Sequence, residues 1–473
     1  YDLVIGGVVS ATFVTVFTHR LTVDGDRKAW RSISTVASFT LLLLIAATLL
    51  VWLFAPYVVD AMTSLHHLDP RRTAEQLAQQ RSATVSFLRW FAPQILLYGV
   101  FALGSVLLQV RGRFGTAAYA PVANNVVAIG VLWWFHLAVP YATVGDTTGT
   151  SQFAWLAGIT TCGLVAQCLI LVPSLRRAGL GRLSLQWNLH DEGVQEILRL
   201  GGWTLVVVAA NQIALYVVLA IAFGLGGEGP VTAYTYGWSF MQMPYAVVVL
   251  SLLGAIGPEL AALFTSGDMA TFNQRVNRAL DAALTVVLPL SIVLVVLAQP
   301  ITAVLLHHAD GSRSLSVGVA LAVLSAGLPG FTIYQVGVRA LQAQRRGVEI
   351  AVLSVGQNAL TLLLALTIGR HSLGALMGSI SISYAVAAVA IVIALWYRGV
   401  DLRQSLATRW MRSTFGVSLA GGLLAAVGYN VRGDTQGLGL VIRLILGALG
   451  AITVMAFWLA RHHARGERIR VKV

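Results

Sequence analysis

The sequence predicts an all-α polytopic membrane protein, and three observations support this class. The 473-residue chain is 57% hydrophobic and 11% charged, which is more apolar surface than a soluble core of this size can bury. The apolar residues lie in runs of about 20, the length at which a helix crosses the ~30 Å hydrocarbon core of a bilayer. These runs are also too long and too uniformly apolar for the alternating strands of a membrane β-barrel.

Thirteen spans are predicted, each bounded by a short polar loop. In chain order they cover 2–18, 33–56, 84–109, 119–140, 152–173, 195–225, 231–256, 277–298, 315–338, 349–369, 372–397, 413–430 and 437–460. Pro56 closes the second span and Pro300 closes the eighth, because proline cannot continue a helix without losing a hydrogen bond. The longest loop, 58–83, separates the second span from the third.

The number of lysine and arginine residues alternates between high and low from one loop to the next. One set of loops and ends carries 24 of these residues, including the C-terminal end, and the other set carries 8. The positive-inside rule therefore places the richer set, and the C-terminus, in the cytoplasm. The net charge of +13 suits an anionic inner leaflet and gives no reason to invoke nucleic acid. Thirteen spans then place Tyr1 outside, so we expect one further helix before it and fourteen spans in the full protein.

Two segments share residues at matched spacing, which indicates an internal duplication. Pro, Tyr, Val, Arg and Asn recur in the same order at Pro93, Tyr98, Val100, Arg113 and Asn125 and at Pro329, Tyr334, Val336, Arg346 and Asn358. Both arginines fall on predicted cytoplasmic loops, so the two copies run in the same direction. The sequence therefore predicts two pseudo-symmetric lobes related as a parallel repeat, followed by a C-terminal helix pair.

Four segments resemble the MurJ/MviN lipid II flippases of the multidrug/oligosaccharidyl-lipid/polysaccharide exporter superfamily. The segments 111–115 (RGRFG) and 120–125 (APVANN) resemble the junction of the family's fourth and fifth helices, and 242–247 (QMPYAV) resembles its eighth helix. Arg339-Ala340 resembles the end of its tenth helix. Together with the two-lobe plan, the resemblance covers essentially the whole chain, beginning at the family's second helix, and is strongest to the actinobacterial branch.

The resemblance implies a transporter and not an enzyme. Such a protein would move lipid II, the undecaprenyl-diphosphate-linked peptidoglycan precursor, from the inner to the outer leaflet of the bacterial plasma membrane by alternating access. The corresponding regions are an N-lobe (1–178), a C-lobe (179–397), a transmembrane helix pair (398–461) and a basic cytoplasmic tail (462–473). This chain departs from many members by carrying Ser239 where they have an arginine.

Polar side chains within spans are the candidates for lining a central cavity. The candidates are Arg89, Asn211, Gln212, Ser239, Gln242 and Arg339. Arginine suits a diphosphate because its planar group of donors matches phosphate oxygens. Two structural explanations compete with this role, namely arginines that extend to the interface and amides that bond between helices.

The sequence leaves other functions open. It has no phosphate-binding glycine-rich loop, HExxH or GxSxG motif, and no cofactor or metal is expected. The alternatives are export of another polyprenyl-linked glycan, a non-transporting membrane scaffold and cation-coupled drug antiport. Antiport is disfavoured because it generally needs a carboxylate near the membrane centre. The expected partners are therefore lipid II and anionic membrane lipids, and the sequence does not indicate an oligomeric state.

Overall fold

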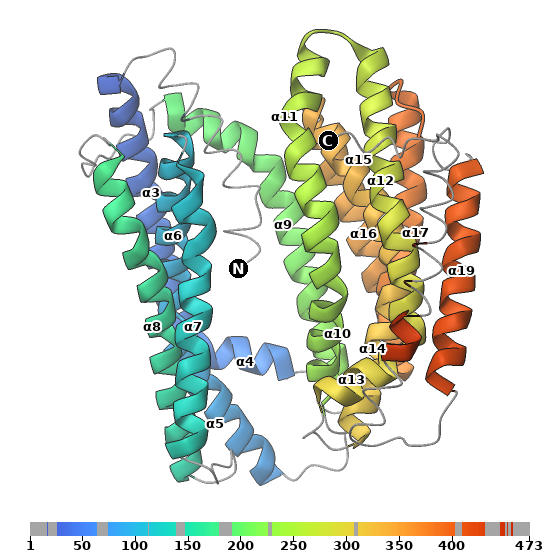
Figure 1. Ribbon diagram of the computed structural model, residues 1–473. Coiled ribbons are helices and arrows are strands. Elements are labelled where there is room, and N and C mark those ends of the chain that lie inside the picture. Colours follow the sequence, from blue (N-terminus) through green and yellow to red (C-terminus); the bar gives the residue numbers. More distant parts are fainter. Residues whose placement is uncertain are drawn as a thin grey trace. The chain divides into compact units, whose positions relative to one another are not determined.

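The computed structural model describes most of the chain and is helical throughout that part (Figure 1). The described residues are 17, 26–63, 74–111, 113–138, 147–178, 192–225, 229–306, 311–402, 409–430, 445–449, 452 and 456. Every regular element among them is a helix. The described residues fall into two compact units, unit 1 ending at Val208 and unit 2 beginning at Ala209. The division lies inside one long helix, α9 (Glu192–Gly224).

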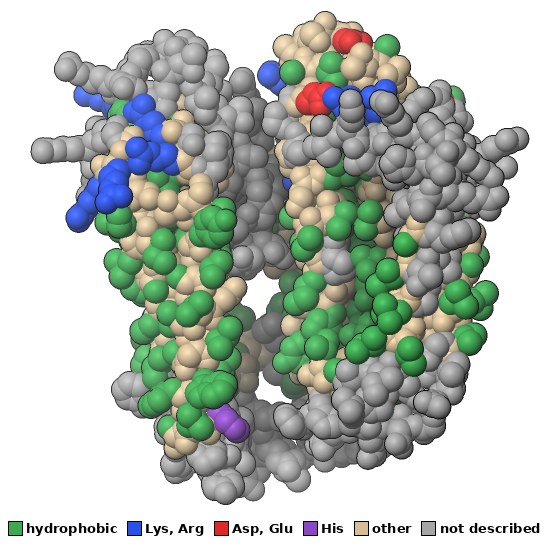
Figure 2. Space-filling model, in the orientation of Figure 1, with side chains coloured by type: hydrophobic (Ala, Val, Ile, Leu, Met, Phe, Trp, Pro, Cys, Tyr) green, Lys and Arg blue, Asp and Glu red, His purple; other side chains and the backbone are tan. Residues whose placement is uncertain are grey.

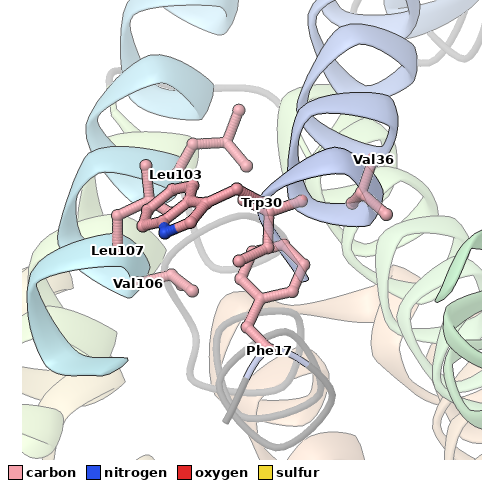
Figure 3. Packing of buried hydrophobic residues seen from close by; sticks show 7 residues of the cluster. Phe17, Trp30, Val36, Leu103, Val106 and Leu107 are labelled. Carbon is pink, nitrogen blue, oxygen red and sulfur yellow. The ribbon is translucent and has the colours of Figure 1, made fainter. Parts of the chain in front are cut away.

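Unit 1 contains six further helices. They are α3 (Asp26–Leu53), α4 (Ala55–Thr63), α5 (Ala74–Phe91), α6 (Pro93–Val110), α7 (Phe114–Ala138) and α8 (Thr147–Arg177). Helix α8 packs against α5, α6 and α7, and α3 packs against α6. Figure 3 shows Trp30 of α3 against Leu103, Val106 and Leu107 of α6, within a buried apolar cluster.

Unit 2 contains the remaining helices. They are α10 (Pro230–Tyr245), the π-helical turn η2 (Ala246–Leu250), α11 (Ser251–Thr265), α12 (Met269–Val296), α13 (Ala298–Leu305), α14 (Gly311–Ala326), α15 (Leu328–Ala343), α16 (Gly347–Thr367), the 3-10 turn η3 (Gly369–His371), α17 (Leu373–Tyr397) and α19 (Arg409–Asn430). Helix α17 packs against α14, α15 and α16, and α12 packs against α15 and α19.

The packing of α12–α17 follows the same order as that of α3–α8. Each begins with a long helix and a short one, α3 and α4 in unit 1 and α12 and α13 in unit 2. Two helices that meet at a proline follow, α5 and α6 in unit 1 and α14 and α15 in unit 2. A helical hairpin ends each series, α7–α8 in unit 1 and α16–α17 in unit 2. The last helix contacts the preceding three in both units, and the first contacts the fourth.

Proline accounts for the break in each of the helix pairs. Helix α6 begins at Pro93, directly after Ala92, and α15 begins next to Pro329, directly after Gly327. Proline has no N–H to donate to the preceding turn, so the helix ends or bends there. The α14–α15 bend is 49°.

The described part of the chain confirms a membrane protein built from helices. Nine of its helical segments are long and apolar enough to cross a bilayer, or ten if the bent α14–α15 pair counts as one span. Helix α19 contains a shorter apolar segment, Thr414–Val427. The predicted spans 2–18 and 437–460 lie mostly outside the described residues, so the total of thirteen stays a prediction.

The span predicted at 231–256 ends nine residues before the end of the helical segment that contains it. The span predicted at 231–256 is part of a helical segment that continues through η2 and α11 to Thr265. The extension carries Glu259, whose carboxylate pairs with Arg275 of α12 at 2.6 Å. The ion pair compensates the charge of Glu259, so the helix can continue past the end of the apolar run. Arg275 belongs to the next helix, so the local sequence does not reveal this pairing.

Candidate functional site

The structure places the six predicted site residues on four helices. Arg89 lies on α5 of unit 1, whereas the other five belong to unit 2. Asn211 and Gln212 lie on α9, Ser239 and Gln242 on α10, and Arg339 on α15.

Arg339 is a half-buried cation in the last two turns of α15. Its Nη1 donates to Oε1 of Gln342, one turn further along, at 3.2 Å. No described carboxylate is ion-paired with Arg339. A cation partly withdrawn from water without an anion is costly, which makes this position suited to an anionic ligand.

Asn211 is joined to α16 by a hydrogen bond. The buried Asn358 donates from Nδ2 to Oδ1 of Asn211 at 2.6 Å and to the carbonyl oxygen of Ser354 at 2.8 Å. Asn211 itself is exposed, as is its neighbour Gln212. The side-chain oxygen of Asn211 therefore joins α9 to α16. Because Asn211 is exposed, its side-chain amide nitrogen can donate to a ligand.

Ser239 and Gln242 lie one turn apart on α10, just before an irregular turn. The Ser239 hydroxyl donates to the carbonyl oxygen of Thr235 at 2.8 Å, so its hydrogen is already used within the helix. Gln242 is half-buried. Two residues beyond Gln242, Pro244 precedes the π-helical turn η2. Turns of this type interrupt a regular helix and often occur at functional sites.

An aromatic cluster beside these residues was missed by the sequence analysis. The centre of the Phe331 ring lies 4.7 Å from the ring centre of Tyr245, 4.8 Å from that of Tyr384 and 6.2 Å from that of Trp238. Tyr334 adds a hydrogen bond between its hydroxyl and Oγ of Ser354, at 2.8 Å. The cluster joins α10, α15 and α17, and edge-to-face ring contacts of this kind are directional.

Arg89 is exposed in the last turn of α5. Its guanidinium carbon lies 5.4 Å from the centre of the Trp52 ring of α3. A cation over an aromatic face keeps its charge and its in-plane donors available to a ligand. No described carboxylate is ion-paired with Arg89. This position is therefore also suited to an anion.

In the described part of the chain, no three His, Cys, Asp or Glu side chains are grouped so that they could hold a metal ion. The six predicted site residues carry guanidinium, amide and hydroxyl groups. They can bind phosphate and form hydrogen bonds.

The sequence matches a known protein family over nearly its whole length. The family model described as "Lipid II flippase MurJ" matches residues 1–450. The probable lipid II flippase MurJ of Rhizobium tropici is 24% identical over 461 residues, which are 95% of this chain and 82% of that protein. The corresponding protein of Rhizobium meliloti (strain 1021) is 26% identical over 365 residues, which are 75% of this chain and 65% of that protein, just under two thirds of its length.

Solved structures show the same fold. A lipid II flippase MurJ in an inward closed conformation superposes with a TM-score of 0.72 at 16% identity, covering 97% of this chain and 89% of that chain. An inward-facing MATE family transporter of the MOP superfamily gives 0.68 at 15% identity, covering 86% and 88%. Because the family model matches nearly the whole sequence, the chain belongs to the MurJ family of lipid II flippases.

Proposed function

We propose that this protein moves lipid II from the inner to the outer leaflet of a bacterial plasma membrane. The observation that carries the proposal is the family match over residues 1–450, on a chain with at least nine apolar spans. A flippase is a transporter and makes or breaks no covalent bond in its cargo. The work required of the protein is therefore to bind a diphosphate and polar head group and to shield them while they cross the bilayer.

Arg89 and Arg339 are the proposed contacts to the diphosphate. Neither is ion-paired with a described carboxylate, so each has a positive charge that is free to bind an anion. The ring of Trp52 orients Arg89, and Gln342 orients Arg339. Pre-oriented donors lose less conformational freedom when a ligand binds, which favours affinity. The exposed amides Asn211 and Gln212, with Ser239 and Gln242, are proposed to contact the uncharged head group.

We also propose that alternating access uses two lobes related as a parallel repeat. The matched packing of α3–α8 and α12–α17 supports this relationship. The breaks before Pro93 and Pro329 and the π-helical turn after Pro244 supply bending points, because each interrupts regular helical hydrogen bonding. The predicted lobe boundary at 178/179 belongs to this proposal, as do the helix pair 398–461 and a cytoplasmic C-terminus.

The proposal is tested in cells depleted of their own lipid II flippase. The protein is expressed in these cells, and outer-leaflet lipid II is measured by its accessibility to a reagent that does not cross the membrane. We expect restored exposure and growth. Absent exposure, despite normal amounts of protein in the membrane, would contradict lipid II as the cargo and would favour another polyprenyl-linked glycan or a non-transporting scaffold.

A further inference from the structure

One end of the α7–α8 hairpin gathers three arginines. The hydroxyls of Thr116 and Ser174 are 2.7 Å apart and join the start of α7 to the end of α8. Arg113 lies three residues before Thr116, whereas Arg176 and Arg177 lie two and three residues after Ser174. Figure 2 shows Lys and Arg side chains gathered at one end of unit 1, above a surface that is mainly apolar. Arg113, Arg176 and Arg177 are called the basic patch below.

The charges of the basic patch are not neutralised by the described residues. All three arginines are exposed, and the described ion pairs involve none of them. The helix dipole explains only part of the patch. It favours Arg176 and Arg177 at the C-terminal end of α8 but disfavours Arg113, which directly precedes the N-terminus of α7.

The comparable end of the α16–α17 hairpin in unit 2 has a different charge arrangement. Glu349 lies three residues after Arg346, as Thr116 lies three residues after Arg113. The Glu349 carboxylate is paired with Arg398 at the end of α17 and lies 3.8 Å from Arg346. One carboxylate of the unit 2 hairpin thus pairs with two of its arginines, whereas a neutral hydroxyl occupies the matching position in unit 1.

An exposed apolar stripe runs along α7 from a point just beyond the basic patch. Tyr119, Val122, Val126 and Ile129 recur every three or four residues and are 75%, 53%, 62% and 64% exposed. This spacing places them on one face of the helix. The ten residue steps from Tyr119 to Ile129 rise about 15 Å, which is half of the ~30 Å hydrocarbon core and the depth of one leaflet.

We propose that the basic patch and this stripe bind an anionic phospholipid of the leaflet that the patch faces. The phosphodiester lies between the three guanidinium groups, and one acyl chain lies along the stripe. Exposed arginines respond to charge more than to head-group shape, so any phospholipid with a net negative charge fits this surface. Its role is to anchor this end of unit 1 in the leaflet, and the assignment does not depend on which cargo the protein moves.

The test measures lipid binding by the purified protein in detergent with native mass spectrometry. The probes are dioleoylphosphatidylglycerol, zwitterionic dioleoylphosphatidylcholine and undecaprenyl diphosphate. The variants are Arg113→Gln/Arg176→Gln/Arg177→Gln, the same triple change to lysine, and the control Arg370→Gln, which removes an exposed arginine at η3 of unit 2. Circular dichroism establishes that each variant is folded.

We expect the triple glutamine variant to lose about 100-fold in affinity for phosphatidylglycerol, since each arginine near an anionic lipid contributes roughly fivefold. The lysine variant and Arg370→Gln keep most of the affinity, and added salt weakens wild-type binding. Unchanged phosphatidylglycerol binding in the glutamine variant would overturn the proposal. So would a loss confined to undecaprenyl diphosphate, because the surface would then belong to the cargo. A wild-type protein that binds phosphatidylglycerol but does not flip lipid II would count against the proposed function and would leave this assignment intact.

Discussion

Asn358 donates a hydrogen bond to Asn211 across 147 residues of sequence, from Nδ2 to Oδ1 at 2.6 Å. The bond joins α16 to α9 three residues after the point at which α9 passes from unit 1 into unit 2. Asn358 is buried, with 7% of its surface exposed, so its amide depends on protein acceptors. This contact gives Asn211 a structural role in addition to the proposed contact with the head group.

A double-mutant cycle measures this hydrogen bond. We expect Asn358→Ala and Asn211→Ala to show a coupling free energy of unfolding of about 0.6 kcal/mol, with an upper range near 1.7 kcal/mol, as found for hydrogen bonds between membrane helices. Unfolding by denaturing detergent, followed by circular dichroism, supplies the values. Gln212→Ala is the matched control for stability and should change it by less than about 0.5 kcal/mol. A coupling of zero would mean that the bond contributes no stability.

Because α15 packs closely on α17, we expect a side chain added at Gly330 to destabilise the protein. A Cβ atom added there would lie 3.0 Å from Cα of Ala385 and 3.3 Å from the carbonyl oxygen of Tyr384. Gly330→Ala therefore forces two backbones apart and should destabilise the protein by about 1–3 kcal/mol. Gly356→Ala on α16 is the control, because its Cβ would meet no atom within 4 Å. Equal midpoints for the two variants in the same unfolding assay would contradict the packing described here.

Acid should weaken the contact between α4 and α5. Arg81 donates to both carboxylate oxygens of Asp60, at 2.5 and 2.8 Å, and these hydrogen bonds lower the pKa of Asp60. A carboxylate with a depressed pKa contributes stability above its ordinary pKa and loses it as pH falls through the depressed value. The contact should therefore be constant from pH 5 to 8 and should weaken below about pH 4.

Hydrogen exchange of the α4 amides measures this dependence. Exchange should accelerate in acid beyond its intrinsic pH dependence, and Asp60→Asn should show the faster rate at neutral pH as well. Protection of α4 that is the same in wild type and Asp60→Asn at pH 7 would show that Asp60 does not hold this helix.

The aromatic support of Arg89 can be tested separately from its charge. Replacing Trp52 with leucine removes the ring under the guanidinium and keeps an apolar residue. Cation–π contacts at exposed sites contribute about 0.5–1 kcal/mol, so binding of a lipid diphosphate should weaken roughly two- to fivefold. Trp133→Leu on α7, another exposed tryptophan, is the control. Weakening of the same size in both variants would remove any specific role for Trp52.

Much of the helical layout was predictable because it depends on local sequence. The run 33–56 corresponds to the span Trp30–Leu53, and Pro93 and Pro329 lie at the two helix breaks. Apolar length and a missing proline N–H determine these features without reference to the rest of the chain. Residues 1–16 and most of 437–460 lie outside the described residues, so the outermost predicted spans stay predictions.

Contacts between distant residues were less predictable. The repeat identified Asn358 as a position of interest, but nothing in the local sequence names Asn211 as its partner. Likewise, the sequence places Phe331 within the predicted span 315–338 but does not reveal that Tyr245 and Tyr384 lie against it. Whether Arg89 and Arg339 serve one ligand also stays a prediction, since they belong to different units.

Transport by the purified protein tests the central claim most directly. Fluorescent lipid II is placed in the inner leaflet of proteoliposomes, and its arrival in the outer leaflet is followed by an impermeant quencher. We expect the wild-type protein and Arg370→Gln to move it at similar rates. Arg89→Gln/Arg339→Gln should be at least about tenfold slower, because each hydrogen bond to a charged group contributes roughly 1.5–3 kcal/mol. Transport by the double variant at the wild-type rate would contradict the assignment of these arginines to the diphosphate.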